Sequence, residues 1–203
     1  MNLPAGPFDL VYADPPLHFE TWSDQGQGRS PSRHYAMMTK PELCQLPIAQ
    51  LAARDSILAI WVYGPRLPDT LTLIEAWGCK YVAIGLTWIK TTTNGSKLVF
   101  GTGHYTRKGS ETLLLAKRGQ GLARKDRGVS EVILAPRREH SRKPDEAAWA
   151  LERLFGPVRR LELFARTERP GWTAWGDQLT AHLKPTTGSL FPTIAIERGG
   201  LTR

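Results

Sequence analysis

The chain opens with an apolar run that is predicted to form a buried strand. Residues 8–13 are apolar apart from Asp9, and the run ends abruptly at Asp14, Pro15 and Pro16. A short apolar run that ends at a chain breaker is typical of a buried strand, and two prolines prevent the strand from continuing. Asp14 is therefore predicted to lie on a stiff turn at the carboxyl end of a strand, where ligands bind in open α/β sheets. The alternative is an ordinary surface turn that contains an aspartate.

Strand and helix patterns alternate along the rest of the chain. Thr39 can cap a helix that begins at Lys40, Glu42 can complete a capping box, and Pro47 is predicted to divide that helix. Further helices are predicted over residues 68–77 and 144–155, and strands over residues 56–63, 80–90, 112–117, 132–135 and 160–165, the last of these being the final strand. The order strand, helix, strand predicts an α/β protein with a mostly parallel sheet.

Two long segments with a loop-like composition, residues 18–39 and 91–108, each follow a predicted strand. Unstructured loops of this length are usually functional or disordered. Both can line the sheet edge that carries Asp14, since the carboxyl ends of parallel strands meet at one edge. The glycine spacing in residues 91–108 fits no phosphate-binding motif.

Composition indicates a globular protein without a membrane span. The chain has 203 residues, of which 41% are hydrophobic, enough for one domain with a full core. No apolar run reaches the length of a membrane span and no signal-peptide pattern is present, so we expect a cytoplasmic protein. Cys44 and Cys79 match no redox spacing, and the histidines show no ligand spacing. We expect no metal site.

Positive charge is concentrated in one segment. The formal net charge is +8, and residues 117–143 contain nine lysines and arginines against three acidic residues. A phosphate-bearing partner would explain this concentration, and the alternative is a solvated basic loop. The sequence therefore makes nucleic acid a candidate partner.

The turn at Asp14 suggests a specific chemistry. An amino group conjugated to an aromatic ring is a poor nucleophile, because its lone pair is delocalised into the ring. The Asp14 carboxylate and the Pro15 carbonyl could each accept one of its two N–H bonds, which would free the lone pair. The prolines matter because acceptors contribute most to catalysis when they are already held in position. The fourth residue, Leu17, offers apolar contact but no aromatic face.

At this point the chain resembles a known family. Residues 14–17, Asp-Pro-Pro-Leu, are similar to the Asp-Pro-Pro-Trp signature of N6-adenine methyltransferases, and more narrowly of the MT-A family. Six further segments match in the family's order, at residues 34–38, 60–62, 88–90, 141–146, 162–166 and 175–178. The resemblance covers residues 8–179 and is specific as a set.

The resemblance implies a Rossmann-like methyltransferase fold, permuted so that the donor-binding strand lies near the C-terminus. It implies a single methyltransferase domain over residues 1–180, followed by an extended tail over residues 181–203. The methyl donor would be S-adenosylmethionine, with no metal. The substrate would be adenine in nucleic acid, with DNA favoured over RNA by analogy with short bacterial and phage members.

The candidate site residues fall into three groups. The catalytic candidates are Asp14, Pro15, Pro16, Leu17 and Lys143. By resemblance, the donor-binding candidates are Asp14, Ser141, Lys143, Glu162, Phe164, Arg166, Asp177 and Gln178. The candidates for contact with the nucleic acid are Trp22, Arg29, Tyr35, Lys90, His104, Glu111, Arg137 and Arg138.

Two departures from the family pattern leave a second hypothesis open: the residue at position 17, and the short stretch before the signature, which lacks the upstream strand of larger members. Leu17 replaces the usual tryptophan, and losing a base–aromatic stack worth about 1–3 kcal/mol could slow the reaction by roughly one to two orders of magnitude. Asp177 stands where the family commonly has asparagine. The chain is therefore expected to be either an active adenine methyltransferase or a degenerate member that binds nucleic acid or a partner subunit. A homodimer or heterodimer is compatible with both.

Overall fold

The computed structural model describes residues 3–17, 37–103, 105–138, 142–177 and 179. Within them the strands are β1 Phe8–Ala13, β2 Ala52–Val62, β3 Lys80–Thr91, β4 Ser110–Arg118, β5 Val132–Pro136, β6 Arg160–Leu163 and β7 Thr173–Trp175. The helices are α1 Lys40–Gln45, α2 Ile48–Leu51, the short 3-10 helix η3 Gly64–Arg66, α3 Leu67–Ala76 and α4 Asp145–Phe155.

The described strands form one seven-stranded sheet in the order β5-β3-β4-β2-β1-β6-β7. β1 pairs in parallel with β2 on one side and with β6 on the other, and β3–β5 and β6–β7 are also parallel. Only β4 runs antiparallel to its neighbours β2 and β3 among these strands. The mostly parallel α/β fold predicted from the sequence is therefore confirmed, and it is consistent with a permuted Rossmann-like methyltransferase fold, with β6 from the C-terminal part beside β1.

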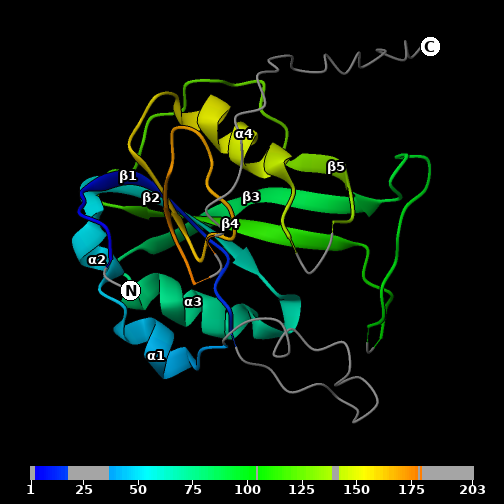
Figure 1. The fold of residues 1–203 in the computed structure, drawn as a ribbon, viewed down its shortest axis with the longest axis horizontal. Helices are drawn as coiled ribbons and strands as arrows, with labels where there is room; N and C mark the ends of the chain where they lie inside the picture. The colour runs from blue at the N-terminus through cyan, green and yellow to red at the C-terminus, as the bar shows by residue number, and fades with distance from the viewer. Residues whose placement is uncertain (1–2, 18–36, 104, 139–141, 178, 180–203) are drawn as a thin grey trace, which may run out of the picture.

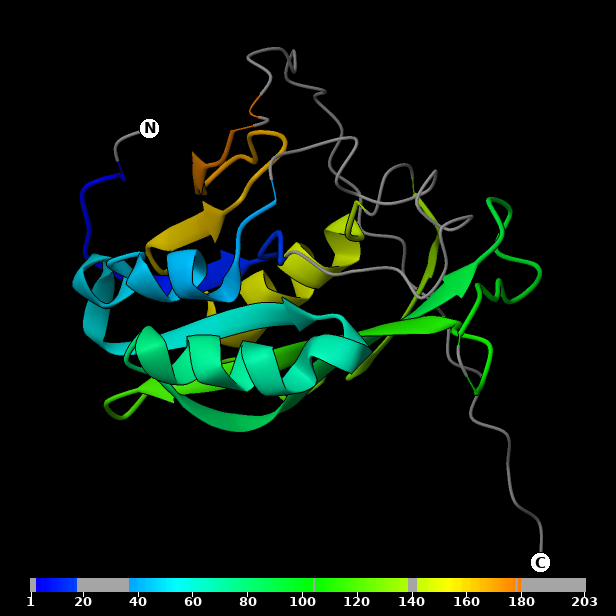
Figure 2. The same ribbon diagram turned by 90° about the horizontal axis from the view of Figure 1, so that it is seen from below.

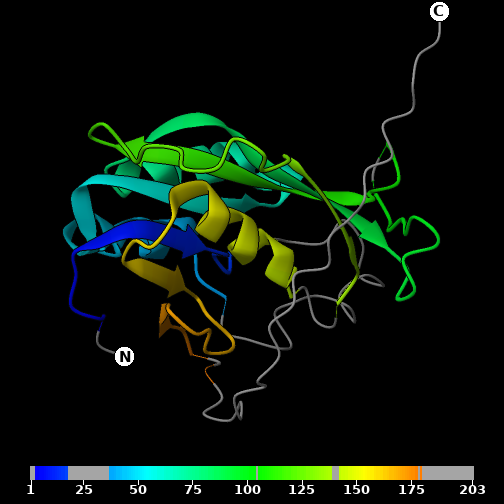
Figure 3. The ribbon, with the colours of Figure 1, turned by 90° about the horizontal axis from the view of Figure 1, so that it is seen from above.

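Helices cover both faces of the sheet, as Figures 1 and 2 show, with α1, α2 and α3 on one side and α4 on the other. In β1, Val11 and Ala13 belong to the core on the α3 side, whereas Leu10 and Tyr12 belong to the core on the α4 side. Figure 3 shows α4 lying across β1 and β2. Burial on both faces explains why β1 and β2 read as nearly continuous apolar runs.

Most element boundaries follow the sequence signals. The Thr39 hydroxyl accepts from the Glu42 N–H, and the Glu42 carboxylate accepts from the Thr39 N–H at 2.7 Å, which confirms the capping box. Pro47 separates α1 from α2 as predicted. The prediction that residues 160–165 form the final strand was wrong, because β6 ends at Leu163 and is followed by β7. Phe164 leaves the extended region at φ 60°, which stops the ladder.

One indole ties the helices of the α3 side together. Trp77, fully buried at the end of α3, donates from Nε1 to the Leu43 carbonyl of α1 at 2.9 Å. Trp77→Phe would remove this donor, leave the Leu43 carbonyl with the Leu46 N–H as its remaining donor, and take away part of a fully buried ring. We expect the variant to lose about 1–3 kcal/mol of unfolding free energy in urea titrations. Trp149→Phe is the control, since Trp149 is 43% exposed and should change stability by less than about 0.5 kcal/mol. Equal stability of the two variants would contradict this role of Trp77.

Candidate active site

Charged residues from four parts of the chain meet at one edge of the sheet. Asp14 directly follows β1, and Lys90 lies near the end of β3. Because β4 runs antiparallel, its first residues lie at this same edge, and Glu111 is paired with Trp88 of β3. Lys143 reaches the edge from the segment before α4. The sheet thus places two carboxylates and two ammonium groups together.

These four side chains form an alternating ionic network. The Lys143 ammonium lies 2.8 Å from Asp14 Oδ2 and 3.2 Å from Glu111 Oε2. Glu111 in turn contacts Lys90 through Oε1 at 2.5 Å. The ammonium of Lys143 also lies 5.6 Å from the ring centre of Trp61, so an aromatic face shields it from one side. The network holds the Asp14 carboxylate in one orientation, as a preorganised acceptor requires.

Burial and the attraction of opposite charges shift the pKa values of Lys143 and Glu111 in opposite directions. Burial alone would lower the pKa of Lys143, but the attraction of Asp14 and Glu111 outweighs it and raises that pKa above 10.5. Burial would raise the pKa of Glu111, but Lys143 and Lys90 hold it below 4.5. Lys143 is therefore an ammonium and Glu111 a carboxylate throughout the neutral range.

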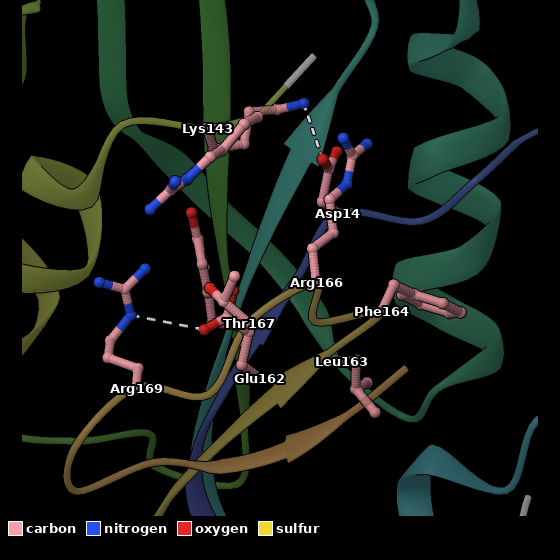
Figure 4. Close-up of a pocket in the computed structure, with 10 residues that line it drawn as sticks. Asp14, Lys143, Glu162, Leu163, Phe164, Arg166, Thr167 and Arg169 are labelled. Atoms are coloured by element: carbon pink, nitrogen blue, oxygen red, sulfur yellow. Dashed lines mark hydrogen bonds and ion pairs between the residues drawn. The ribbon is translucent and has the colours of Figure 1, made fainter. Parts of the chain in front are cut away.

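A pocket opens beside Asp14 at the carboxyl ends of β1 and β6 (Figure 4). Its wall carries acids and cations together: Tyr12, Asp14, Arg142, Lys143, Glu162, Leu163, Phe164, Arg166, Thr167 and Arg169. Glu162 is paired with Tyr12 across the β1–β6 ladder and points into this pocket. Burial raises the pKa of the Glu162 carboxyl, and Arg169, 3.5 Å away, only partly offsets the effect.

The wall beyond Glu162 depends on close backbone packing. Phe164 adopts a positive φ of 60°, uncommon for a residue other than glycine, and packs edge-on against Trp175 at 5.6 Å between ring centres. Ala165 donates its N–H to the Trp175 carbonyl at 2.9 Å. A side chain at residue 176 would meet the Ala165 carbonyl oxygen, which explains the glycine at this position.

Three functional candidates in the site were missed by sequence reasoning. Asp145 binds the guanidinium groups of Arg138 at 2.9 Å, Arg169 at 3.1 Å and Arg142 at 3.4 Å. Arg169 thereby connects Asp145 with Glu162, and Tyr12 accepts a hydrogen bond from Trp61 Nε1 at 2.7 Å. Tyr12 could have been found, because it lies two residues before Asp14 and strand side chains repeat with that period. No local pattern identifies Arg169.

The structure gathers some of the predicted site residues and leaves others apart. Lys90 and Glu111 join Asp14 and Lys143 in the network, whereas Glu162, Phe164 and Arg166 line the pocket. Arg138 pairs with Asp145 instead of standing as a separate cation. Asp177 and Arg137 are not among the residues that line the pocket. The candidates that lie outside the described residues are Trp22, Arg29, Tyr35, His104, Ser141 and Gln178.

The Asp-Pro-Pro-Leu turn is fixed by its own backbone. The Pro15 carbonyl accepts from the Leu17 N–H at 2.8 Å, and the Pro16 carbonyl accepts from the Met38 N–H at 2.9 Å. A carbonyl oxygen has two lone pairs, so the Pro15 carbonyl can accept a second hydrogen bond. The Leu17 side chain is buried with Leu43 and Leu73.

Neither metal ligation nor membrane insertion is indicated where the structure can be read. Within the described part of the chain, no three His, Cys, Asp or Glu side chains are grouped as a metal ion would need. No helix there is long and apolar enough to cross a membrane.

Comparison with known proteins identifies the family. The sequence model of the MT-A70 family matches residues 8–178. The chain is 30% identical to the type II methyltransferase M.MunI of a Mycoplasma species over 86% of this chain and 79% of that protein. It is 32% identical to the N6-methyladenosine RNA methyltransferase MTA1 of Cryphonectria parasitica, with 88% of this chain and 53% of that protein covered. It is also 32% identical to the human N(6)-adenosine-methyltransferase catalytic subunit METTL3, over 86% of this chain and 28% of that protein. The chain therefore belongs to the MT-A70 family of methyltransferases.

Proposed function

We propose that this protein transfers a methyl group from S-adenosylmethionine to the N6 amino group of adenine in DNA. The observation that carries the proposal is the Asp14 carboxylate, fixed 2.8 Å from the Lys143 ammonium beside a pocket of mixed charge. The MT-A70 match and the names of the relatives support the reaction class. DNA is preferred to RNA because the relative that the chain covers over 79% of its length is a type II methyltransferase.

Asp14 and the Pro15 carbonyl would accept the two N–H bonds of the target amino group. This arrangement draws the nitrogen lone pair out of the ring, so that it can form the new N–C bond. When bound, the donor supplies an activated methyl group whose C–S bond breaks with the electron pair returning to sulfur. The methylated amino group then carries a surplus proton and is strongly acidic. Asp14, the nearest carboxylate, can take that proton and release it to solvent.

The pocket beside Asp14 fits the charge pattern of the donor. S-adenosylmethionine carries a carboxylate, an ammonium group, a sulfonium and ribose hydroxyls, so its site needs both acceptors and cations. Glu162 and Asp14 are the acceptors in the pocket wall, and Arg166 and Lys143 are among its cations. Guanidinium groups bind carboxylates well, and buried carboxylates accept from hydroxyl or ammonium donors. These residues would hold the donor next to the target amino group.

A degenerate, non-catalytic member remains the second candidate, and Leu17 is the observation that favours it. The side chain of Leu17 packs with Leu43 and Leu73 and offers no aromatic face to a base. A protein that only binds nucleic acid would have no need for a fixed carboxylate at residue 14. Loss of that carboxylate therefore separates the two candidates.

Asp14→Asn is the first test of catalysis. The variant keeps the size of the side chain but removes the charge and one acceptor, so we expect methyl transfer to fall by at least about 100-fold. The assay is transfer of labelled methyl from S-adenosylmethionine to adenine-containing DNA and RNA. Asp9→Asn is the matched control, because Asp9 lies near the start of β1, the strand that Asp14 follows, and is paired at 3.0 Å with Arg159, outside the pocket wall. Full activity of Asp14→Asn would rule out the proposed role.

Glu111→Gln tests the ionic network through its pH dependence. The pKa of Glu111 lies below 4.5 in the folded protein, so its stabilisation is fully present above pH 4.5 and is lost as the pH falls through the folded pKa. We expect the variant to be about 1–3 kcal/mol less stable at neutral pH, with the difference from wild type vanishing in acid. Urea titrations across the pH range measure this difference. A difference that persists unchanged in acid would contradict the network.

Glu162→Gln tests the donor pocket. The pKa of Glu162 is raised above 4.5, so its carboxylate becomes protonated at a higher pH than an ordinary glutamate. We expect wild-type affinity for S-adenosylmethionine to fall as the pH drops through that raised pKa. The variant should bind about tenfold more weakly at neutral pH, without this acid-dependent loss. Calorimetric titration measures both quantities, and a variant with wild-type affinity and the same pH dependence would refute the assignment.

A further inference from the structure

An exposed group of aromatic and basic side chains lies beside the ionic network. We call Tyr63, Phe100, Arg107 and Lys108 the aromatic–basic patch. Tyr63 is 47% exposed and Phe100 is 48% exposed, so both present much of their ring surface to solvent. The Lys108 ammonium lies 4.3 Å from the ring centre of Tyr63, and the Arg107 guanidinium lies 5.8 Å from that of Phe100. Each ring of the patch is therefore combined with a cation.

Backbone contacts join the four side chains into one surface. Gly101 donates its N–H to the Lys108 carbonyl at 2.7 Å, which holds the two arms of the β3–β4 connection together. A side chain at residue 109 would meet the Phe100 ring at 3.0 Å. Tyr63 directly follows β2, whose carboxyl end lies at the same edge. Figures 1 and 3 show that the β3–β4 connection extends beyond the rest of the sheet at this edge.

The patch continues the charged network of the candidate active site. Lys90 donates its N–H to the Gly109 carbonyl at 2.8 Å, and Glu111 follows two residues later. Burial lowers the pKa of Lys108, the Glu111 carboxylate opposes this effect, and the Lys90 ammonium adds to it. An added negative group, such as a phosphate, would therefore be favourable beside Lys108.

The charge of the β3–β4 connection indicates which class of partner the patch would bind. Residues 91–110 contain Lys97, Arg107 and Lys108 and no acidic residue. Aromatic rings next to cations are the combination that single-stranded nucleic acids bind, with bases stacked on the rings and phosphates beside the cations. A base-paired duplex keeps its base faces stacked internally and cannot use the rings in this way. An apolar protein partner would gain nothing from the cation beside each ring.

We propose that the aromatic–basic patch binds unpaired nucleotides that flank the target adenine, so that the protein prefers single-stranded or locally unpaired nucleic acid as its substrate. The inference rests on the proposed function and adds the strandedness of the substrate to it. Tyr63 and Phe100 would each supply one stacking surface. Lys108 and Arg107 would neutralise the adjacent phosphates.

The test compares binding of single-stranded and duplex DNA of the same sequence. The probe is a short fluorescein-labelled, adenine-containing oligonucleotide, used alone and annealed to its complement, with fluorescence anisotropy as the measurement. We expect Tyr63→Ala and Phe100→Ala each to weaken single-strand binding about tenfold, with little change for the duplex. Tyr81→Ala is the matched control, since Tyr81 is 48% exposed near the amino end of β3, away from the patch. Phe100→Trp preserves a stacking face and should bind at least as tightly as wild type.

Unchanged single-strand affinity in the double alanine variant would overturn the inference, as would an equal loss for single strand and duplex. A change in sedimentation mass with unchanged oligonucleotide binding would also overturn it, because the patch would then be a protein interface. The binding assay needs no catalysis, so the two proposals can fail separately. Loss of single-strand binding in the variants, with no methyl transfer by the wild-type protein, would support the patch and refute the enzyme.

Discussion

The ammonium of Lys143, buried between two carboxylates, is the interaction on which the site depends. It lies 2.8 Å from Asp14 and 3.2 Å from Glu111, and without it these carboxylates would repel each other across a partly buried space. Removing one member of a buried ionic group leaves an uncompensated charge, which is far more costly than the pair is stabilising. The network therefore fixes the Asp14 carboxylate in position, as its proposed role requires.

The topology of the sheet explains how residues 14, 90, 111 and 143 come together. β1 lies between β2 and β6, so the turn after β1 is flanked by the carboxyl ends of two parallel strands. Because β4 is antiparallel, its first residues lie at this edge, and Glu111 is one of them. A parallel strand would place its last residues there. One edge of the sheet thereby carries the Asp14 carboxylate, which is proposed to accept from the target amino group. The same edge carries the pocket for the proposed methyl donor and the basic β3–β4 connection proposed to bind nucleic acid.

Local patterns predicted the elements well, because breakers and caps act over a few residues. The Asp14-Pro15-Pro16 stop and the Thr39–Glu42 capping box were readable from sequence for this reason. The end of β6 was not readable, since Phe164 leaves the strand at φ 60° and its ring packs against Trp175, a tertiary contact eleven residues away. The partners of Asp145 and Arg169 depend on tertiary contacts across helix and loop, and no periodicity in the chain reports them.

Ion pairs with Asp145, Asp14 and Glu111 change the interpretation of the basic segment 117–143. Its excess of cations was interpreted as a phosphate-binding surface, yet Arg138 and Arg142 are bound to Asp145, and Lys143 is bound to Asp14 and Glu111. These three cations are paired with carboxylates within the site. The net charge counted along the sequence therefore overstates the positive charge that this segment presents to a polyanion. Residues 91–110 have fewer cations but contain no acid that could neutralise them. Charge that is not compensated within its own segment attracts phosphate, which agrees with the proposal that the β3–β4 connection contacts nucleic acid.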